Sequence, residues 1–445
     1  MIANDTIVAT ATPVGVGALA IVRMSGENSA RILALLTGEQ PGPARVAVLR
    51  RLRAKSGEIL DEAIVIRYEA PHSYTGENAV EVVCHGGIVT ATRITQEFVA
   101  AGARPAQPGE FTRRAVMNGR LDLLQAEAVN DLIWSRSTAG ATLALRQLDG
   151  GLSRRVVQLR EDILGLEALA AYEIDFPEED DGPVDDVRIR NATDDLVRSI
   201  QWLIDTTPAG ELVRHGAVVA IVGAPNVGKS SMFNALLGRQ RALVTDVPGT
   251  TRDALEAVLD TVPVPLRLVD TAGLRETSDQ VEQLGVTLTR EYVRNAAAVL
   301  ACGDSEETLV AAREEAERDA TGVVIPVQTK RDLKYPGIPG ALGVSAVTGE
   351  GLERLVGRVS ELIAQKAQLP DAESPVVTHT RYREVLERAL HELTAFQSAR
   401  GSEDLPATVS AVHLRESARI LEELVGGIDV EDVLGRVFSS FCVGK

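Results

Sequence analysis

Residues Gly223 to Ser230 read Gly-Ala-Pro-Asn-Val-Gly-Lys-Ser, a spacing that can cradle phosphate groups. Glycines let backbone N–H groups converge on the phosphates, and the start of a following helix adds positive potential. In such a loop Lys229 reaches the β- and γ-oxygens, and the Ser230 hydroxyl binds Mg²⁺. A glycine-rich turn without a ligand is the alternative. The apolar run before the loop and the helix-compatible segment after it favour the phosphate site.

Three further motifs follow this loop in order. Asp270-Thr271-Ala272-Gly273 closes an apolar run, where a metal-linked carboxylate and a γ-phosphate-sensing glycine belong. At the end of a later run, Asp332 can accept two hydrogen bonds from the N–H edge of guanine, which adenine does not offer. Thr329 precedes it where GTPases usually have Asn, a departure that weakens one contact. With Ser345-Ala346 fitting the loop behind the base, the order predicts a guanine-nucleotide hydrolase and disfavours a kinase or an ATPase.

The transferred phosphoryl group also needs positive charge beside it, and no arginine finger can be identified within the chain. Asn226, inside the loop, is a candidate ligand for a monovalent cation, unless it only satisfies its own turn. The backbone oxygens of Thr245 and Val247 could help hold that cation, and Thr251 could complete the Mg²⁺ shell. The nucleotide-binding residues predicted in the phosphate loop and in switch I are Asn226, Val227, Gly228, Lys229, Ser230, Ser231, Thr245, Asp246, Val247, Pro248, Gly249, Thr250 and Thr251; those predicted beyond are Asp270, Thr271, Ala272, Gly273, Thr329, Lys330, Asp332, Ser345 and Ala346.

The elements that must position these residues follow a strand–loop–helix rhythm. Short apolar runs suit buried parallel strands, and helical segments separate them, which is typical of a doubly wound α/β domain. The predicted strands are Val218–Val222, Leu266–Val269, Val299–Cys302, Val323–Val327 and Leu342–Val344.

The flanks of this domain are of two kinds. The first 118 residues mix short β-like runs with turns and one or two helices, which favours an α+β domain. From Leu121 onward, and again after Pro370, apolar residues recur at helical spacing. The acidic stretch 173–186 is predicted as a solvated connection. The predicted strands of the first domain are Ile7–Ala11, Ala18–Met24, Ala63–Tyr68 and Val80–Cys84.

Bulk properties set limits on the partners. The chain has 445 residues, with 63 acidic and 46 basic ones for a net charge of −17, which disfavours non-specific capture of nucleic acid. Three widely spaced cysteines predict a reduced compartment without disulfides. The first 13 residues do not resemble a signal peptide, and no apolar run approaches the roughly 18 residues of a membrane span. We expect a soluble, cytoplasmic protein without a membrane anchor.

The sequence resembles the MnmE (TrmE) family of tRNA uridine-modification GTPases over essentially its whole length. GAPNVGKSS, GTTRD and DTAGLRET resemble the family's GTPase motifs. HSYTGENAVEVVCHGG, PGEFTRRAVMNGRLDLLQAEAV and the terminal FCVGK resemble segments that GTPases in general do not have. The resemblance implies three domains: residues 1–118 for tetrahydrofolate binding and dimerisation, 119–213 with 369–445 as a helical domain, and 214–368 as the inserted GTPase (G) domain.

The family resemblance also implies an activity. It implies a K⁺-stimulated GTPase and a homodimer whose G domains meet around nucleotide. With the flavoprotein MnmG (GidA) and 5-formyl- or methylene-tetrahydrofolate, it would add an aminomethyl-type group to C5 of the wobble uridine of tRNA. By motif, Asn226, Thr245, Val247 and Thr250 would hold K⁺, while Ser230 and Thr251 would hold Mg²⁺. The catalytic residues implied are Lys229, Asn226 and Glu282, the last orienting the attacking water unless it is a solvated helix-start residue.

The folate site implied by the resemblance comprises Arg23, Glu81, Arg120 and Lys445. Basic groups suit a glutamate tail, and a carboxylate can accept hydrogen bonds from a pterin's guanidine-like edge. Each residue taken alone is more often surface charge. Cys442 could be nucleophilic, but a structural or folate-adjacent role is the simpler interpretation. The basic run 45–55 could contact RNA, although a solvated strand edge accounts for it equally simply.

Two other functional classes compete with this interpretation. A ribosome-assembly GTPase would carry an RNA-binding module, whereas the flanks here are acidic and helical. The soluble part of a membrane-associated GTPase would need an anchor, and no apolar run in the sequence offers one.

Overall fold

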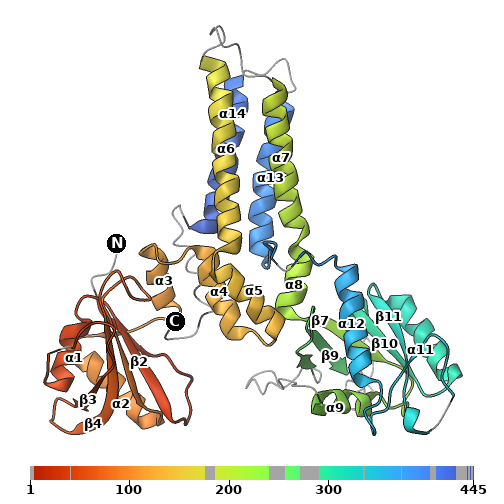
Figure 1. The fold of residues 1–445 in the computed structure, drawn as a ribbon, viewed down its shortest axis with the longest axis horizontal. Helices are drawn as coiled ribbons and strands as arrows, with labels where there is room; N and C mark the ends of the chain where they lie inside the picture. The colour runs from red at the N-terminus through yellow and green to blue at the C-terminus, as the bar shows by residue number, and fades with distance from the viewer. Residues whose placement is uncertain are drawn as a thin grey trace, which may run out of the picture. The chain divides into compact units, whose positions relative to one another are not determined.

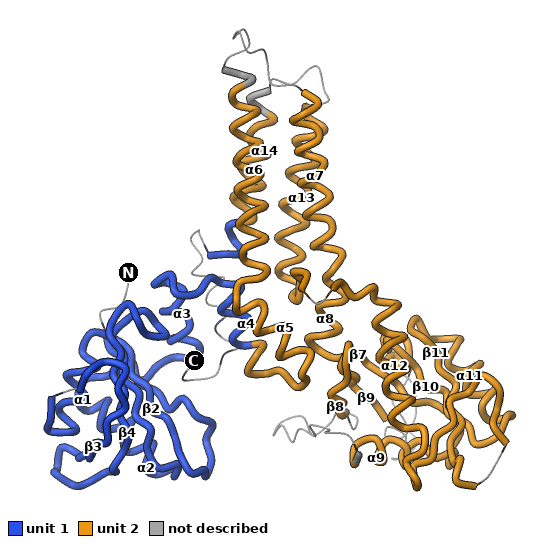
Figure 2. The backbone as a smooth tube through the Cα atoms, in the orientation of Figure 1, with its two compact units in different colours: residues 1–130, 422–445 blue, residues 131–421 orange. Residues whose placement is uncertain are grey.

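The computed structural model describes residues 5–40, 42–175, 186–239, 256–270, 290–333, 336–371, 373–400, 407–426, 438, 441 and 444. The chain divides into two compact units, residues 1–130 with 422–445 and residues 131–421 (Figure 2). The second unit groups the α/β domain with most of the helices that flank it in sequence. The three predicted domain boundaries therefore stay predictions.

The first unit is built on a six-stranded sheet in the order β3-β4-β5-β2-β1-β6. Neighbouring strands are antiparallel, except that β1 and β6 run parallel. The basic run 45–55 contains β3, which lies at the edge of this sheet. The strands are β1 (Ile7–Thr10), β2 (Leu19–Ser25), β3 (Val48–Arg53), β4 (Ile59–Tyr68), β5 (Ala79–His85) and β6 (Arg104–Pro105).

The two faces of this sheet differ in chemistry because side chains alternate along a strand. Val22 and Met24 of β2 point to one face, into an apolar core closed by α1 (Ser29–Thr37) and α2 (Ile88–Ala100). Arg23, between the two, therefore belongs to the opposite face. On β5 the same alternation buries Val80 and Val82 in the core and places Glu81 beside Arg23. Helix α3 (Glu110–Met117) follows β6 in the chain.

The second unit contains the α/β domain, whose sheet has the order β12-β11-β10-β7-β9-β8. The five predicted strands are present and parallel, so the predicted multidomain fold with a P-loop α/β domain is confirmed. Strand β8 was not predicted, and it pairs antiparallel with β9. The strands are β7 (Ala217–Val222), β8 (Glu256–Leu259), β9 (Leu266–Asp270), β10 (Ala298–Gly303), β11 (Val323–Gln328) and β12 (Leu342–Gly343).

Helices cover both faces of this parallel sheet, as its buried apolar strands require. On one face, α9 (Lys229–Arg239) and α12 (Leu352–Lys366) pack against the strands in one apolar core. On the other face, α11 (Glu306–Asp319) closes a smaller core through Ala312 and Ala316. Figure 1 shows β10 and β11 lying between α12 and α11. The result is the doubly wound arrangement that the sequence predicts.

The remaining helices precede and follow the α/β domain in the chain. Four of them, α6, α7, α13 and α14, run side by side (Figure 1). A hydrogen bond from Ser417 Oγ to the Ala389 carbonyl, 2.9 Å, joins α14 to α13. Helix α6 continues to Asp175, so the connection predicted for 173–186 begins later than expected. The helices are α4 (Leu123–Trp134), α5 (Thr138–Leu148), α6 (Gly151–Asp175), α7 (Asp186–Asp205), α8 (Thr207–His215), α13 (Thr380–Arg400) and α14 (Ala407–Val425).

The chain enters the α/β domain from α8 and leaves it toward α13, and these two passages lie against each other. The Thr206 hydroxyl accepts a hydrogen bond from the Val377 amide at 3.0 Å. The contact is so close that a Cβ on Gly210 would lie 2.1 Å from the Val377 carbonyl oxygen. A residue larger than glycine would therefore push the two passages apart.

The α/β domain also touches the helices through the turn between β8 and β9. The carboxylate of Asp260 accepts hydrogen bonds from the Thr138 amide at 2.7 Å and the Thr138 hydroxyl at 2.6 Å, at the start of α5. A carboxylate at a helix start satisfies free N–H groups and complements the helix dipole. This turn is thus attached to α5.

Candidate functional site

The phosphate loop lies between β7 and α9, at the carboxyl end of the parallel strand (Figure 1). Gly223 has φ 143° and Gly228 has φ 100°, a region that favours glycine. A Cβ on Gly223 would lie 2.2 Å from the Cys302 carbonyl oxygen. Asn226 has φ 62° and is exposed. The spacing of glycines in the sequence is thus explained by backbone conformation and close packing.

Lys229 provides the positive charge of this loop. Its side chain is 9% exposed, and the ammonium donates to the carbonyl oxygens of Gly223 and Ala224, 2.8 Å from each. The charge is therefore held inside the loop rather than in solvent. Ser230 and Ser231 follow at the exposed start of α9, where N–H groups and a hydroxyl can meet an anion and its metal ion.

Asp270 closes β9 beside the loop. Its backbone pairs with Ile221 of β7, and its side chain is 3% exposed. Below the loop, burial raises the pKa of the Cys302 thiol to about 12. Cys302 is therefore a packing residue at neutral pH, because the thiolate is the reactive form.

The predicted base-selecting loop follows β11. The buried Ser345 hydroxyl donates to Asp332 Oδ1 at 2.7 Å, which leaves the second carboxylate oxygen available as an acceptor. Lys330 has φ 54°, and its ammonium lies 2.7 Å from Asp304 Oδ2. That hydrogen bond lowers the pKa of Asp304. Asp304 was not predicted, although it follows β10 as Asp270 ends β9, and that position is the signal that could have found it.

The structure brings the predicted residues of the phosphate loop, Asp270, the 329–332 loop and Ser345-Ala346 to one edge of the sheet, where the strands end. The remaining predictions for this site lie outside the described residues. They are Thr245, Asp246, Val247, Pro248, Gly249, Thr250, Thr251, Thr271, Ala272, Gly273 and Glu282.

A second polar site lies on the first unit, on the sheet face opposite α1 and α2. It is a cavity of about 140 Å³. Arg23 and Glu81 face each other across β2 and β5, with Arg23 Nε 2.9 Å and Nη2 2.7 Å from Glu81 Oε1. The residues that line the cavity are Arg23, Ser25, Tyr68, Tyr74, Thr75, Ala79, Glu81 and Phe111.

Aromatic side chains complete this cavity, and none of them was predicted. The Arg23 guanidinium lies over the rings of Tyr74 and Phe111, 5.3 and 5.8 Å from their centroids. The Tyr68 hydroxyl donates to Glu81 Oε2 at 3.2 Å. Burial, then the charge of Glu81, raises the pKa of Tyr68, so its hydroxyl keeps its proton and remains a donor.

Of the other two predicted folate residues, the structure describes Arg120 but not Lys445. The stem of Arg120 packs on the loop beside Thr75, 3.1 Å from where a Cβ on Gly76 would lie. Lys445 and Cys442 lie outside the described residues. The neighbouring Gly444 is described, and its carbonyl oxygen is 3.5 Å from Arg23 Nη1. Gly444 thus approaches the same arginine as Glu81.

A charged network supports this pocket. Arg114 is 7% exposed at its side chain and pairs with Asp5 at 2.6 Å and with Glu77 and Glu110 at 3.1 Å. Glu77 in turn accepts a 2.7 Å hydrogen bond from Ser25 in the pocket wall. Burial alone would raise the pKa of Asp5 and of Glu110. Hydrogen bonds from Arg104, and then from Arg114, outweigh burial and lower both pKa values.

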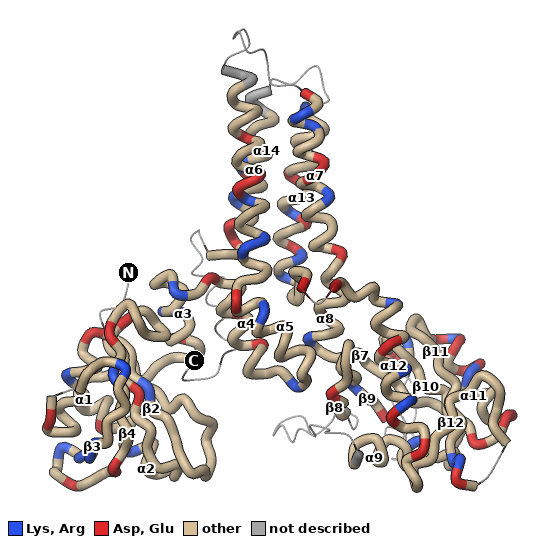
Figure 3. Tube along the Cα trace, in the orientation of Figure 1, with Lys and Arg blue, Asp and Glu red and all other residues tan. Residues whose placement is uncertain are grey.

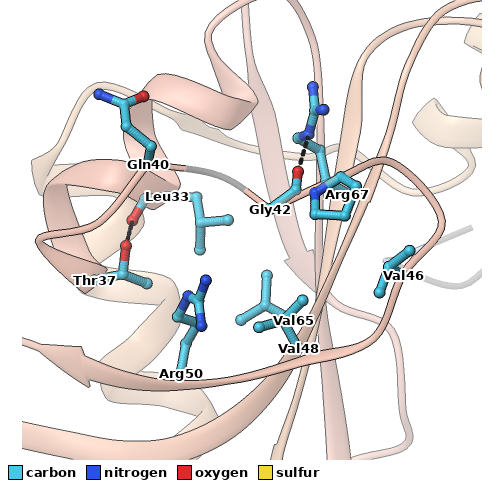
Figure 4. A pocket seen from close by; sticks show the side chains of 10 residues that line it. Leu33, Thr37, Gln40, Gly42, Val46, Val48, Arg50, Val65 and Arg67 are labelled. Atoms are coloured by element: carbon cyan, nitrogen blue, oxygen red, sulfur yellow. Dashed lines mark hydrogen bonds between the residues drawn. The ribbon is translucent and has the colours of Figure 1, made fainter.

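The basic edge strand β3 carries arginines that are largely paired. Arg50 lies 3.1 Å from Glu39, and Arg51 lies 3.3 Å from Glu62. The hollow beside β3 measures about 10 Å³, room for at most one water molecule, and Arg67 donates to the Gly42 carbonyl at its rim (Figure 4). Figure 3 likewise shows basic and acidic residues interspersed along α6, α7, α13 and α14. These features favour the solvated strand edge over an RNA-binding surface.

The described residues contain no group of three or more His, Cys, Asp or Glu side chains arranged to hold a metal ion. None of their helices has both the length and the apolar character needed to cross a membrane.

A doubly wound domain with a lysine-bearing phosphate loop after β7, a carboxylate at the end of β9 and a braced Asp332 after β11 defines a P-loop GTPase. The family model of the MnmE helical domain matches residues 123–442, and that of the N-terminus of the GTP-binding protein TrmE matches residues 6–120.

Relatives match over the full length. The tRNA modification GTPase MnmE of Moorella thermoacetica is 40% identical, covering 99% of this chain and 100% of its own. That of Aquifex aeolicus is 41% identical with the same coverage. The solved G domain of the T. maritima FeoB iron transporter is 30% identical over 33% of this chain and 98% of its own, with a TM-score of 0.25. The chain belongs to the MnmE (TrmE) family of tRNA modification GTPases, which confirms the resemblance.

Proposed function

We propose that this chain is a K⁺-stimulated GTPase that modifies C5 of the wobble uridine of tRNA, acting with the flavoprotein MnmG and a one-carbon tetrahydrofolate. The observation that carries the proposal is the presence of two built sites in one chain. One is the phosphate loop with its guanine-selecting Asp332, and the other is the Arg23–Glu81 pocket on the first unit. We also propose a homodimer that works in the cytoplasm, where tRNA is available.

The GTPase half of the proposal assigns a role to each residue of the phosphate site. Lys229 contacts the β- and γ-phosphates from inside the loop, and Asp332 selects guanine. Ser230 and Thr251 would hold Mg²⁺, which would neutralise charge on the phosphate oxygens. Glu282 orients the attacking water through a second water. Hydrolysis then times the opening and closing of the G domains.

For K⁺ the residue types fit. Asn226 offers an amide oxygen from an exposed, left-handed position in the loop, and Thr245, Val247 and Thr250 would add oxygens. Oxygen donors suit alkali cations, and such a charge would stand where other GTPases use an arginine. This cation would stabilise the negative charge that develops during phosphoryl transfer.

The cation role is tested by GTP hydrolysis in K⁺ and in Na⁺. Wild type should hydrolyse GTP about tenfold or more faster in K⁺, and Asn226→Ala should lose most of that difference. Asn234→Ala, an exposed asparagine farther along α9, is the matched control and should keep it. Equal wild-type rates in the two salts would rule out cation activation.

The second pocket fits one end of a folate. Glu81 offers a carboxylate to a pterin's guanidine-like edge, and the Tyr74 and Phe111 rings offer apolar faces to a flat heterocycle. Arg120 and Lys445 suit the anionic glutamate tail. The bound tetrahydrofolate supplies the one-carbon unit. In this proposal the chain's own residues bind and orient it, while the flavin of MnmG serves the redox step.

Folate binding is tested by calorimetry with 5-formyl-tetrahydrofolate. Glu81→Gln keeps the shape of the side chain but should weaken binding by about tenfold or more, since it removes a charge-assisted hydrogen bond. Glu62→Gln is the control, because Glu62 also pairs with an arginine across strands but has an exposed side chain. Equal losses in both variants would contradict the pocket assignment.

The tRNA role is tested by deleting the gene and analysing tRNA nucleosides by mass spectrometry. Loss of the modified wobble uridine with normal ribosomal subunits is expected. Normal wobble uridine with defective subunits would instead support the ribosome-assembly GTPase.

A further inference from the structure

Thr329 stands at the junction of the two nucleotide loops. Its side chain is buried, and its hydroxyl donates to the carbonyl oxygen of Val227 in the phosphate loop. The carbonyl oxygen of Gly303 lies 3.2 Å from the same hydroxyl and accepts the Thr329 amide at 2.9 Å. The loop predicted to read the base is therefore also attached to the loop that holds the phosphates.

Val227 provides the carbonyl oxygen of the phosphate loop that the Thr329 hydroxyl contacts. It lies between Asn226, which has φ 62°, and Gly228, which has φ 100°. Val227 therefore separates two residues with positive φ. The carbonyl of Val227 and the N–H of Gly228 belong to one planar trans peptide, so they point in opposite directions. Holding the carbonyl toward Thr329 thus turns the Gly228 N–H to the other side, where phosphate would lie.

The hydroxyl of Thr329 has a single proton to donate. In this protein the carbonyl oxygens of Val227 and Gly303 are the acceptors for that proton. None is left for the acceptor nitrogen N7 of a purine. Asp332, by contrast, has one carboxylate oxygen engaged by Ser345 and one available to the base.

We propose that Thr329 is a positioning residue that sets the orientation of the Val227–Gly228 peptide, and that it does not read the base. The protein therefore binds guanine nucleotides without using N7 through this side chain, and Asp332 carries the base selection. The inference rests on guanine-nucleotide binding at this site, which the wild-type measurement below tests separately.

The test uses the full chain and measures Kd by calorimetry for GDP and for 7-deaza-GDP, in which a C–H replaces N7. Wild type should bind both within about twofold. Thr329→Val has nearly the same shape but lacks the proton, and should weaken both by about tenfold because a buried carbonyl loses its donor. Thr329→Ser should restore both affinities. The matched control is Thr321→Val, which removes a 2.7 Å hydrogen bond to the Arg294 carbonyl away from the site.

Hydrogen exchange of the nucleotide-free protein gives a second readout. In Thr329→Val, or in Thr329→Ala if the valine variant does not fold, peptides covering 223–231 should exchange faster while those of α11 do not change. Unchanged affinity and exchange would overturn the proposal. A wild type that binds GDP tenfold more tightly than 7-deaza-GDP, with the preference lost in Thr329→Val, would show that Thr329 reads the base. A wild type that binds neither nucleotide would contradict the guanine site itself.

Discussion

At the scale of single residues, the glycines of the phosphate loop are fixed by backbone packing. Gly223→Ala would place a methyl group 2.2 Å from a carbonyl oxygen of β10, at a φ that alanine rarely adopts. We expect this variant to lose GDP affinity by about tenfold or more, because the loop must shift, and to unfold at a lower temperature.

The matched substitution for that measurement is Gly238→Ala. Gly238 lies in the same unit, on α9, and a Cβ there would meet nothing within 4 Å. It should leave GDP affinity unchanged and should raise helix stability slightly. Equal losses in the two variants would show that the packing against β10 is unimportant.

Asp332 supports a prediction about specificity. Asp332→Asn replaces an acceptor oxygen by an N–H₂ group, which repels the N–H edge of guanine and suits the carbonyl that xanthine has there. The variant should lose GTP affinity by about a hundredfold and prefer XTP. Competition binding with GTP and XTP measures the preference. Retention of the wild-type order would exclude Asp332 as the base selector.

At the scale of elements, the charged network around Arg114 supports the pocket wall. Arg114→Met would leave the carboxylates of Asp5, Glu77 and Glu110 without the guanidinium between them. Removing one partner of a buried ion network destabilises by about 3 kcal/mol or more. Urea unfolding of the full chain at pH 7 measures this loss, with hydrogen exchange of the β1 and β2 peptides as the readout. Arg51→Met, on the exposed edge strand, should have little effect.

The same network predicts a pH dependence. The folded-state pKa values of Asp5 and Glu110 are lowered, so the stability they contribute is present above their ordinary pKa of about 4. It is lost as the pH falls through the lowered values. Wild type should therefore lose stability of β1 and β2 below about pH 4, and Arg104→Met, which removes the largest arginine contribution to both lowered pKa values, should lose much less over that range. Parallel curves for the two proteins would contradict the role given to Arg104.

The sequence predicts those elements whose pattern is local. Each parallel strand is a short apolar run, and the predicted phosphate loop, Asp270 and the 329–332 loop stand at or just after the ends of such runs, so the phosphate site could be predicted before the structure. Strand β8 has four residues and pairs antiparallel with β9, and nothing in four residues distinguishes it from a loop. Tyr68 and Phe111 come from β4 and α3, so only the strand register and helix packing bring them to Arg23.

At the scale of the whole molecule, two units with separate sheets and cores should unfold separately. Calorimetry of the full chain should resolve two transitions. Saturating GDP should shift only that of residues 131–421, and 5-formyl-tetrahydrofolate only the other, since a ligand stabilises the unit that binds it. At a hundred times Kd the gain is about 2.7 kcal/mol. One transition that both ligands shift would show that the two units unfold as one.

The chain enters the α/β domain after α8 and leaves it before α13, and a hydrogen bond between Thr206 and Val377 holds these two segments together. This arrangement has a consequence for how such a chain can evolve. A domain whose entry and exit lie together interrupts its host at a single point. The helical scaffold could lose the whole GTPase and close the gap with a short loop, or accept another GTPase in its place. The α/β domain is in this sense an exchangeable insertion, and its two adjoining connections to the helices are a natural site for recombination between genes.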